Sequence, residues 1–230
     1  MIIDLILLSC FYWILTHIFI NSIDNDGVMK GYDFKIIEQI RKSVSIPITV
    51  LGGAGTLNDL GSVIQKFGIN EMDGTHGIGH TRMATESAVT TLGAHPFSTG
   101  PDQCLVHNGS LSNHNQLRQK LISEGMEINT ENDTEVAASY LSLQIKKGKT
   151  LEQSLELALS DLDGFYTFLV GTKDGFGVLR DPISCKPAVM AENDYYVAFG
   201  SEYRAFANLP EINHAKIWEP EPATVYFWKH

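Results

Sequence analysis

The succession of helices and short strands between residues 104 and 200 constrains the fold of this 230-residue chain more than any other feature. Periodicity and end signals predict helices at 115–124, 134–147 and 151–160, the last opened by the capping-box pattern of Thr150 and Gln153. Apolar runs predict strands at 77–81, 104–107, 165–170, 177–179, 188–190 and 196–199. Asp174-Gly175, between two of these strands, is a hairpin signal. Helices set among hairpin-linked strands indicate an α+β sandwich.

A different pattern precedes residues 70–75. Apolar runs predict strands at 18–23 and 46–51, and spaced apolar side chains between them predict a helix at 32–44. A strand, a helix and a second strand in this order form a βαβ unit with parallel strands. The sequence therefore divides into an unassigned apolar segment at 1–17, a βαβ segment at 18–70 and a larger domain at 74–230.

Composition narrows the function classes. The formal net charge of -10 argues against a nucleic-acid partner, because such binding needs clustered Lys and Arg. Three scattered cysteines, none in a Cys-x-x-Cys pair, favour a reducing, cytoplasmic setting.

The first twenty residues are long enough to span a bilayer, but Asp4 stands where a targeting segment would carry Lys or Arg, so a membrane segment is the disfavoured alternative.

Three signatures follow one another in the larger domain: His80-Thr-Arg-Met-Ala-Thr85, His107-Asn-Gly109 and Glu131-Asn-Asp-Thr-Glu135. In this order they resemble the glutaminase domain of class II glutamine amidotransferases, and later segments such as Asp163-Gly-Phe-Tyr-Thr-Phe168 extend the likeness. Within that family the section is similar to small glutaminase-type proteins related to glutamate synthase, including the glutaminase-like subunit of N-methylglutamate synthase. The resemblance implies the four-layer αββα sandwich of N-terminal-nucleophile hydrolases.

The resemblance also implies site roles. Arg82 would bind the α-carboxylate of glutamine with its planar fork, Thr85 would contact the substrate, and Asp133 would bind the α-ammonium. The Asn108 amide and the Gly109 backbone N–H would form an oxyanion hole. Relatives of this kind pass ammonia to a synthase subunit, so glutamine and such a subunit are the expected partners, and no cofactor is expected.

Each polar position also has an ordinary structural interpretation. An isolated Asn-Gly is most often a turn, and Asp133 could be only the N-cap of the helix that follows it. The eight histidines, among them His76 and His80, raise the alternative of a metal site. No His-Glu-x-x-His or Cys/His pairing accompanies them, so no metal is expected.

The nucleophile that the resemblance requires is a cysteine at the first residue of the domain, whose own α-amine serves as the base. Residue 1 is Met, and Cys10 is followed by Phe-Tyr-Trp rather than by Gly and an aliphatic residue. We therefore expect little or no glutaminase activity from this chain. Removal of nine residues to expose Cys10 is one alternative. A non-catalytic glutamine-binding subunit and a chimeric gene product are the others.

Residues 18–69 carry a second resemblance. Asn21-Ser-Ile-Asp-Asn-Asp-Gly27 and Leu51-Gly-Gly-Ala-Gly55 are similar to segments of the cyclase subunit of imidazole glycerol phosphate synthase, a (β/α)8 barrel. The resemblance implies phosphate-binding residues, namely Asp26, Gly27, Gly52 and Gly53. About two of the eight βα units of a barrel are present, so we expect a barrel fragment. The alternative for the glycine cluster is a flexible turn.

Overall fold

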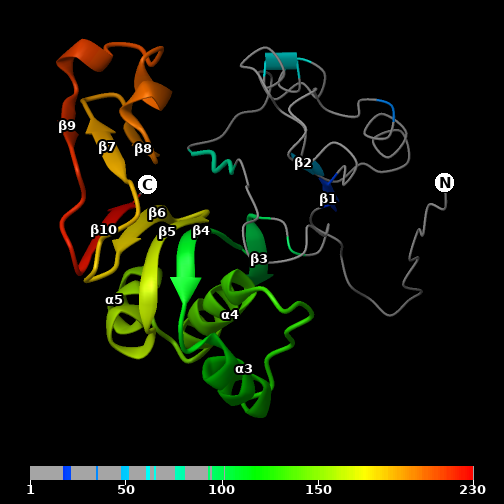
Figure 1. Cartoon of the computed structure of the whole chain (residues 1–230). Coiled ribbons are helices and arrows are strands. Elements are labelled where there is room, and N and C mark those ends of the chain that lie inside the picture. Colours follow the sequence, from blue (N-terminus) through cyan, green and yellow to red (C-terminus); the bar gives the residue numbers. More distant parts are fainter. Residues whose placement is uncertain are drawn as a thin grey trace. The chain divides into compact units, whose positions relative to one another are not determined.

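The computed structural model describes residues 18–21, 35, 48–51, 61–62, 65, 76–80, 93, 95–100 and 102–229 (Figure 1). Contacts between residues divide the chain into two compact units. The first unit contains β1 (Ile18–Asn21) and β2 (Ile48–Leu51), and the second contains every element from β3 onward.

The first unit has the two strands that the sequence predicts. β1 and β2 pair in parallel, with Ile18 opposite Ile48. Lys35, between the two strands in the sequence, is helical and falls within the predicted helix 32–44. Parallel pairing agrees with a βαβ unit. The segment 1–17, the rest of that helix and the predicted phosphate-binding residues Asp26, Gly27, Gly52 and Gly53 lie outside the described residues, so these assignments stay predictions.

The second unit is built on a five-stranded antiparallel sheet in the order β10-β6-β5-β4-β3. Its strands are β3 (Phe97–Gly100), β4 (Gln103–Leu111), β5 (Gly164–Thr172), β6 (Gly175–Arg180) and β10 (Thr224–Lys229). Thr172 pairs with Gly175 across the two residues between β5 and β6. The predicted hairpin is therefore confirmed.

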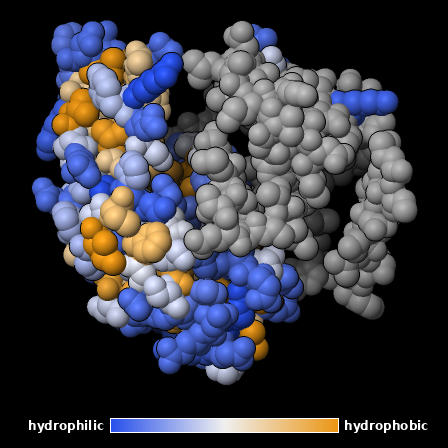
Figure 2. All heavy atoms as spheres, viewed as in Figure 1, coloured by the Kyte–Doolittle hydropathy of each residue, from blue (hydrophilic) through white to orange (hydrophobic). Residues whose placement is uncertain are grey.

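Three helices cover one face of this sheet, as Figure 1 shows: α3 (His114–Ser123), α4 (Asp133–Lys146) and α5 (Leu151–Asp161). Each lies within a residue or so of its predicted range because its end signals are local. The capping box is confirmed, since the Gln153 backbone N–H donates to Thr150 Oγ1 and the Thr150 N–H donates to Gln153 Oε1, both at 3.1 Å. Leu141 of α4 and Leu155 of α5 pack against Phe168 of β5 in the main core. The outer surface of α3 is mainly hydrophilic (Figure 2).

A second sheet packs on the other face of the first. β7 (Val189–Glu192), β8 (Val197–Gly200) and β9 (Lys216–Trp218) form it in the order β8-β7-β9. Short 3-10 helices at Tyr203–Phe206 and Ile212–His214 lie between β8 and β9. Met190 of β7, fully buried, packs with Val106 and Val178 from the five-stranded sheet. One layer of helices and two antiparallel sheets therefore make up a mixed α/β unit. The fourth layer of the predicted αββα sandwich stays a prediction.

One strand that the sequence predicts is not found, and three strands of the structure were not predicted. Residues 76–80 are not a strand, contrary to the expectation for 77–81. His76 and Ile78 lie instead against Gly171, where an added Cβ would be 2.9 Å from each side chain. The segment therefore packs on β5 through its side chains and forms no backbone ladder there. β3, β9 and β10 were not predicted. Among the described residues no helix is long and apolar enough to cross a membrane.

Candidate active site

The Asn108-Gly109 pair lies inside β4 and not in a turn. Asn108 is opposite Thr167 and Gly109 is opposite Tyr166 in the ladder with β5. Gly109 has a φ of 144°, and a Cβ there would lie 2.0 Å from the carbonyl oxygen of Phe165. Only glycine fits such a position. The turn interpretation of Asn-Gly is therefore wrong, because strand pairing outweighs the local turn preference.

Among the described residues, no strand pairs with the edge of β4 beside Gly109. β3 pairs with β4 at Gln103 and Leu105, before the Asn-Gly pair is reached. Further along, the Leu111 backbone N–H donates to Asp133 Oδ2 at 2.9 Å. Backbone groups two residues apart on a strand point to the same side, so the Gly109 N–H is directed to this same edge. An N–H at this edge can donate to an oxyanion.

Asp133 is the first residue of α4 and not its cap. The cap is Asn132, whose side chain accepts from the Thr134 backbone N–H at 2.9 Å. The Asp133 side chain keeps 22% of its surface exposed, and its Oδ1 lies 3.6 Å from His107 Nδ1. A carboxylate at a helix N-terminus is stabilised by the helix dipole. The N-cap interpretation is thus wrong, and a partly exposed anion faces the end of β4.

A chain of polar side chains, buried except for the half-buried His80, joins the three signatures. The Thr134 hydroxyl is hydrogen-bonded to His107 Nδ1 and to His95 Nε2, each at 3.0 Å. The His95 ring stacks on His80 at a centroid distance of 4.5 Å. His80 belongs to the first signature, His107 to the second and Thr134 to the third. Segments 27 or more residues apart in the sequence therefore meet at one place.

Burial fixes the protonation state of His107. Desolvation lowers its pKa from 6.5 to about 4, nearby Asp133 opposes the shift, and the positive charge of Lys186 adds to it. The imidazole is therefore neutral near neutral pH. A neutral ring can hold one hydrogen bond to Thr134 without placing a second charge beside Asp133.

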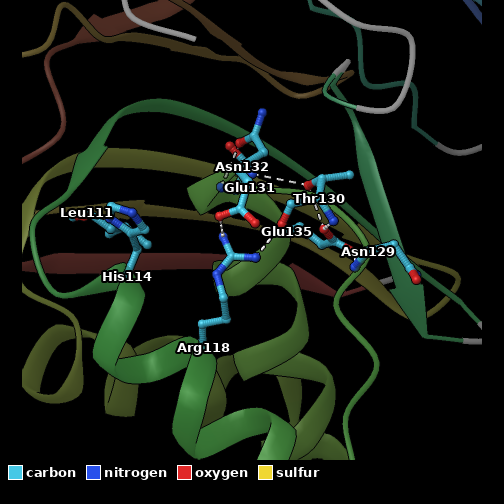
Figure 3. A network of polar contacts seen from close by, with 9 residues as sticks. Leu111, His114, Arg118, Asn129, Thr130, Glu131, Asn132 and Glu135 are labelled. Carbon is cyan, nitrogen blue, oxygen red and sulfur yellow. Dashed lines mark hydrogen bonds and ion pairs between the residues drawn. The ribbon is translucent and has the colours of Figure 1, made fainter. Parts of the chain in front are cut away.

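The segment that leads into α4 is held by a polar network that the sequence analysis did not identify (Figure 3). Glu135 accepts hydrogen bonds from the backbone N–H groups of Asn129, at 2.8 Å, and Thr130, at 2.6 Å. Arg118 reaches across from α3, donates to the Thr130 carbonyl and lies 3.9 Å from Glu131. The network fixes the direction in which the chain enters α4, and with it the position of Asp133. Its sequence signal is a glutamate three residues after the cap, the spacing of a capping box.

A row of side chains continues from Asn108 across the sheet. Asn108, Thr167 and Arg180 are directly opposite one another on β4, β5 and β6 and so share the face toward the second sheet. Arg180 is 1% exposed and donates to the Ser184 carbonyl and to Glu219, each at 2.8 Å. Sequence analysis assigned no role to Thr167 or Arg180, because only the register places them beside Asn108.

Arg82, Thr85 and Cys10 lie outside the residues that the structure describes, so their predicted roles stay predictions. The other two cysteines are described and lie elsewhere. Cys104 is in β4, and burial raises the pKa of its thiol from 9.0 to about 11, which makes the reactive thiolate rare. Cys185 is exposed in the loop after β6. Within the part of the chain that the structure describes, no group of three or more His, Cys, Asp or Glu side chains could hold a metal ion.

Known families match both parts of the chain. Residues 80–208 match the glutamine amidotransferase domain family, and residues 12–72 match the histidine biosynthesis protein family. The glutamine amidotransferase-like protein GlxB of Rhizobium meliloti (strain 1021) is 73% identical over 168 residues, which make up 73% of this chain and 56% of that protein. This chain therefore spans little more than half the length of GlxB.

More distant relatives agree with this match. The isomerizing glutamine–fructose-6-phosphate aminotransferase of Mycobacterium bovis is 31% identical over 77% of this chain and 28% of its own length. The structure of the glutamine phosphoribosylpyrophosphate amidotransferase from B. subtilis, complexed with ADP and GMP, is 29% identical with a TM-score of 0.54, over 65% of this chain and 32% of that one. Since the family match covers more than half of the sequence and includes all three signatures, the chain belongs to the glutamine amidotransferase family, of the class II, N-terminal-nucleophile type.

Proposed function

We propose that the second unit binds glutamine at the meeting point of β4 and the N-terminus of α4. The observation that carries this proposal is the convergence of the three signatures through the His80, His95, Thr134 and His107 side chains. Such a chain of polar contacts holds β4, the N-terminal turn of α4 and the segments around His80 and His95 in one arrangement. The arrangement supports a single site rather than three separate turns and caps.

Within this site the Asp133 carboxylate binds the α-ammonium of glutamine. Asn108 and the Gly109 N–H donate to the carboxamide oxygen, where negative charge develops during hydrolysis. Arg82 and Thr85, in the first signature, bind the α-carboxylate. The reaction of this domain type is hydrolysis of glutamine to glutamate, with ammonia passed to a synthase partner.

We further propose that a polypeptide of the printed sequence, with Met1 at its N-terminus, hydrolyses glutamine slowly or not at all. The attacking thiolate needs a neighbouring base, and in this family that base is the free α-amine of the same cysteine. Cys104 and Cys185 are internal, and the thiol of Cys104 is held protonated by burial. Exposure of Cys10 by cleavage would be the route to an active form.

The second candidate function is a non-catalytic glutamine-binding subunit. It is supported by the same geometry, because ligand binding needs Asp133 and the β4 edge but needs no nucleophile.

Around this site we propose the domain bounds 74–230 for the amidotransferase part, with the four-layer αββα sandwich as its fold. Residues 18–70 would be the fragment of a (β/α)8 barrel, with Asp26, Gly27, Gly52 and Gly53 on its phosphate side.

Glutamine binding tests the site directly. Isothermal titration of the full chain should detect binding, and Asp133→Asn should weaken it at least about tenfold, a loss of about 1.4 kcal/mol. Asparagine can still accept from the Leu111 N–H, so the fold should persist. Asp194→Asn, at an exposed position, is the matched control and should bind as the parent does. Equal affinity of the parent and Asp133→Asn would remove Asp133 from the site.

Ammonia release separates the two candidate functions. We expect glutamine binding without ammonia release from protein whose N-terminal sequencing begins at Met1. Release that appears together with a new N-terminus at Cys10, and is lost in Cys10→Ala, would establish the processed glutaminase. Rapid release from intact protein would contradict the proposed inactivity while leaving the binding site in place.

A further inference from the structure

The outer strand of the five-stranded sheet has one backbone edge that no described strand pairs with. β10 is hydrogen-bonded to β6 only. The Ser112 N–H donates to the Asp163 carbonyl, so odd-numbered residues of β5 point their backbone groups to β4 and even-numbered ones to β6. Even-numbered residues of β5 are opposite odd-numbered residues of β6, so the even-numbered residues of β6 point to β10. Tyr226 is opposite Val178, which turns the even-numbered residues of β10 toward β6. The N–H and C=O groups of Val225, Phe227 and Lys229 therefore point outward.

A groove follows this edge. It is lined from α5, β7, β9, the segment after β9 and β10 itself, by Glu152, Glu192, Lys216, Trp218, Glu219, Glu221, Val225, Tyr226, Phe227 and Trp228. The lining residues come from both faces of the five-stranded sheet. An extended chain in this groove would therefore have β10 beside it and side chains above and below.

The two sides of the groove differ in chemistry. On the helix side, Val225 and Phe227 are apolar and pack at the rim of the main core. On the opposite side, Tyr226 lies between Trp228 and Trp218, with ring centroids 6.1 and 6.4 Å away. Because side chains of a strand alternate between faces, an added strand would place alternate residues against apolar and against aromatic surface.

The charges of the groove favour a cationic occupant. Four of its residues are glutamates and one is lysine, and since Glu219 is paired with Arg180, three carboxylates stand against one ammonium. The lysine, Lys216, already places its Nζ 4.9 Å from the centroid of the Trp218 ring, which shows that this aromatic side accepts a cation. A second copy of the chain would bring the same four carboxylates and a net charge of -10, so pairing of β10 with itself is opposed by like charge.

We propose that β10 is a docking edge for an extended segment of a partner protein that carries Lys or Arg at alternate positions and aliphatic residues between them. The segment adds a sixth strand, with its backbone bonded to Val225, Phe227 and Lys229. Its cations face Glu192, Glu221 and the aromatic row, and its aliphatic side chains face Val225 and Phe227. Strand addition gives affinity through main-chain bonds and specificity through alternate side chains.

The probe is the acetylated and amidated peptide Lys-Val-Lys-Val-Lys-Val-Lys, titrated into the full chain by calorimetry and by tryptophan fluorescence. We expect saturable binding and a change in tryptophan emission, since Trp218 and Trp228 line the groove. A peptide of the same composition with its lysines and valines in separate blocks should bind at least about tenfold more weakly, because it cannot alternate. Equal binding of the two peptides would reduce the effect to net charge and overturn the proposal.

Two variants locate the site. Glu221→Lys should raise the dissociation constant at least about fivefold, through repulsion in the groove. Glu127→Lys, an exposed substitution in the segment between α3 and α4, no residue of which lines the groove, should leave it unchanged. A similar loss in both variants would show long-range attraction rather than docking at β10.

The backbone contribution is tested with Val225→Pro, which removes one outward N–H, against Val225→Ala, which keeps it. Proline should abolish binding and alanine should not. A peptide N-methylated at alternate residues gives the same test with unaltered protein, and it should also fail to bind. Retained affinity for the N-methylated peptide, or a concentration-dependent dimer of the free chain in sedimentation, would each contradict strand addition by a basic partner.

Discussion

The centre of the five-stranded sheet and its outer strand differ in how closely neighbouring backbone encloses them. Between β4 and β5, a Cβ at Gly109 would lie 2.0 Å from the Phe165 carbonyl oxygen, so the two backbones leave no room for a side chain. At β10, one backbone edge is paired with no described strand and the side chains are only partly buried. The centre holds the residues proposed to bind glutamine. The outer strand presents the surface proposed to bind a partner.

This contrast suggests how the unit divides its tasks. An oxyanion hole needs donors whose positions do not change during the reaction, and a strand locked between neighbours provides them. Binding of a partner by strand addition needs a row of unpaired backbone groups along a strand, and the outer edge of β10 has one among the described residues. Substitutions should therefore cost most at the centre of the sheet and least at β10.

The largest effect is expected for Gly109→Ala compared with Gly177→Ala. At Gly109 the added methyl meets backbone atoms and the φ of 144° is unfavourable for alanine, so we expect a loss of about 4 kcal/mol or failure to fold. At Gly177 on β6, next to the outer strand, the nearest atom is Cδ1 of the Leu155 side chain, at 2.6 Å, which can shift at a cost of roughly 1–2 kcal/mol. Urea unfolding of both variants measures the difference. Equal losses would show that the centre is no more tightly enclosed than β6.

The next largest effect concerns pH at the centre. Burial lowers the pKa of His107 from 6.5 to about 4, so the unfolded chain binds more protons than the folded one between these values. Stability should therefore fall as the pH drops below about 6.5, by about 2 kcal/mol at pH 5 and about 3 kcal/mol at pH 4. His107→Gln should flatten this slope between about pH 7 and pH 5, where few carboxylates titrate. An unchanged slope in that variant would assign the loss to other groups.

The helices could be predicted closely because their signals are local. Thr150 with Gln153 marks the start of α5, and the glycines at 125 and 148 mark the ends of the two helices before it. The hairpin between β5 and β6 follows equally from neighbouring residues. β10 was not predicted, although its aromatic and β-branched residues are typical of a strand.

The candidate site was only partly predictable, for a physical reason. Asn108 and Asp133 were recognised by residue type, yet their local context pointed to a turn and a cap. Pairing of β4 with β5 and the cap at Asn132 decided otherwise. The contact of Thr134 with His95 spans 39 residues and exists only once the sheet and α4 have packed. No local pattern contains that information.

The smallest expected effect compares equal truncations at the centre and at the outer strand. Val170 of β5 is fully buried in the main core, whereas Val225 of β10 packs at the rim of the same core. Removing two methyl groups should cost about 2 kcal/mol in Val170→Ala but less than about 1 kcal/mol in Val225→Ala, because the exposed site keeps water contact and leaves no closed cavity. Thermal and urea unfolding of the two variants measure this difference of about 1 kcal/mol. If Val225→Ala costs as much as Val170→Ala, the helix-side face of β10 is enclosed as tightly as the centre of the sheet.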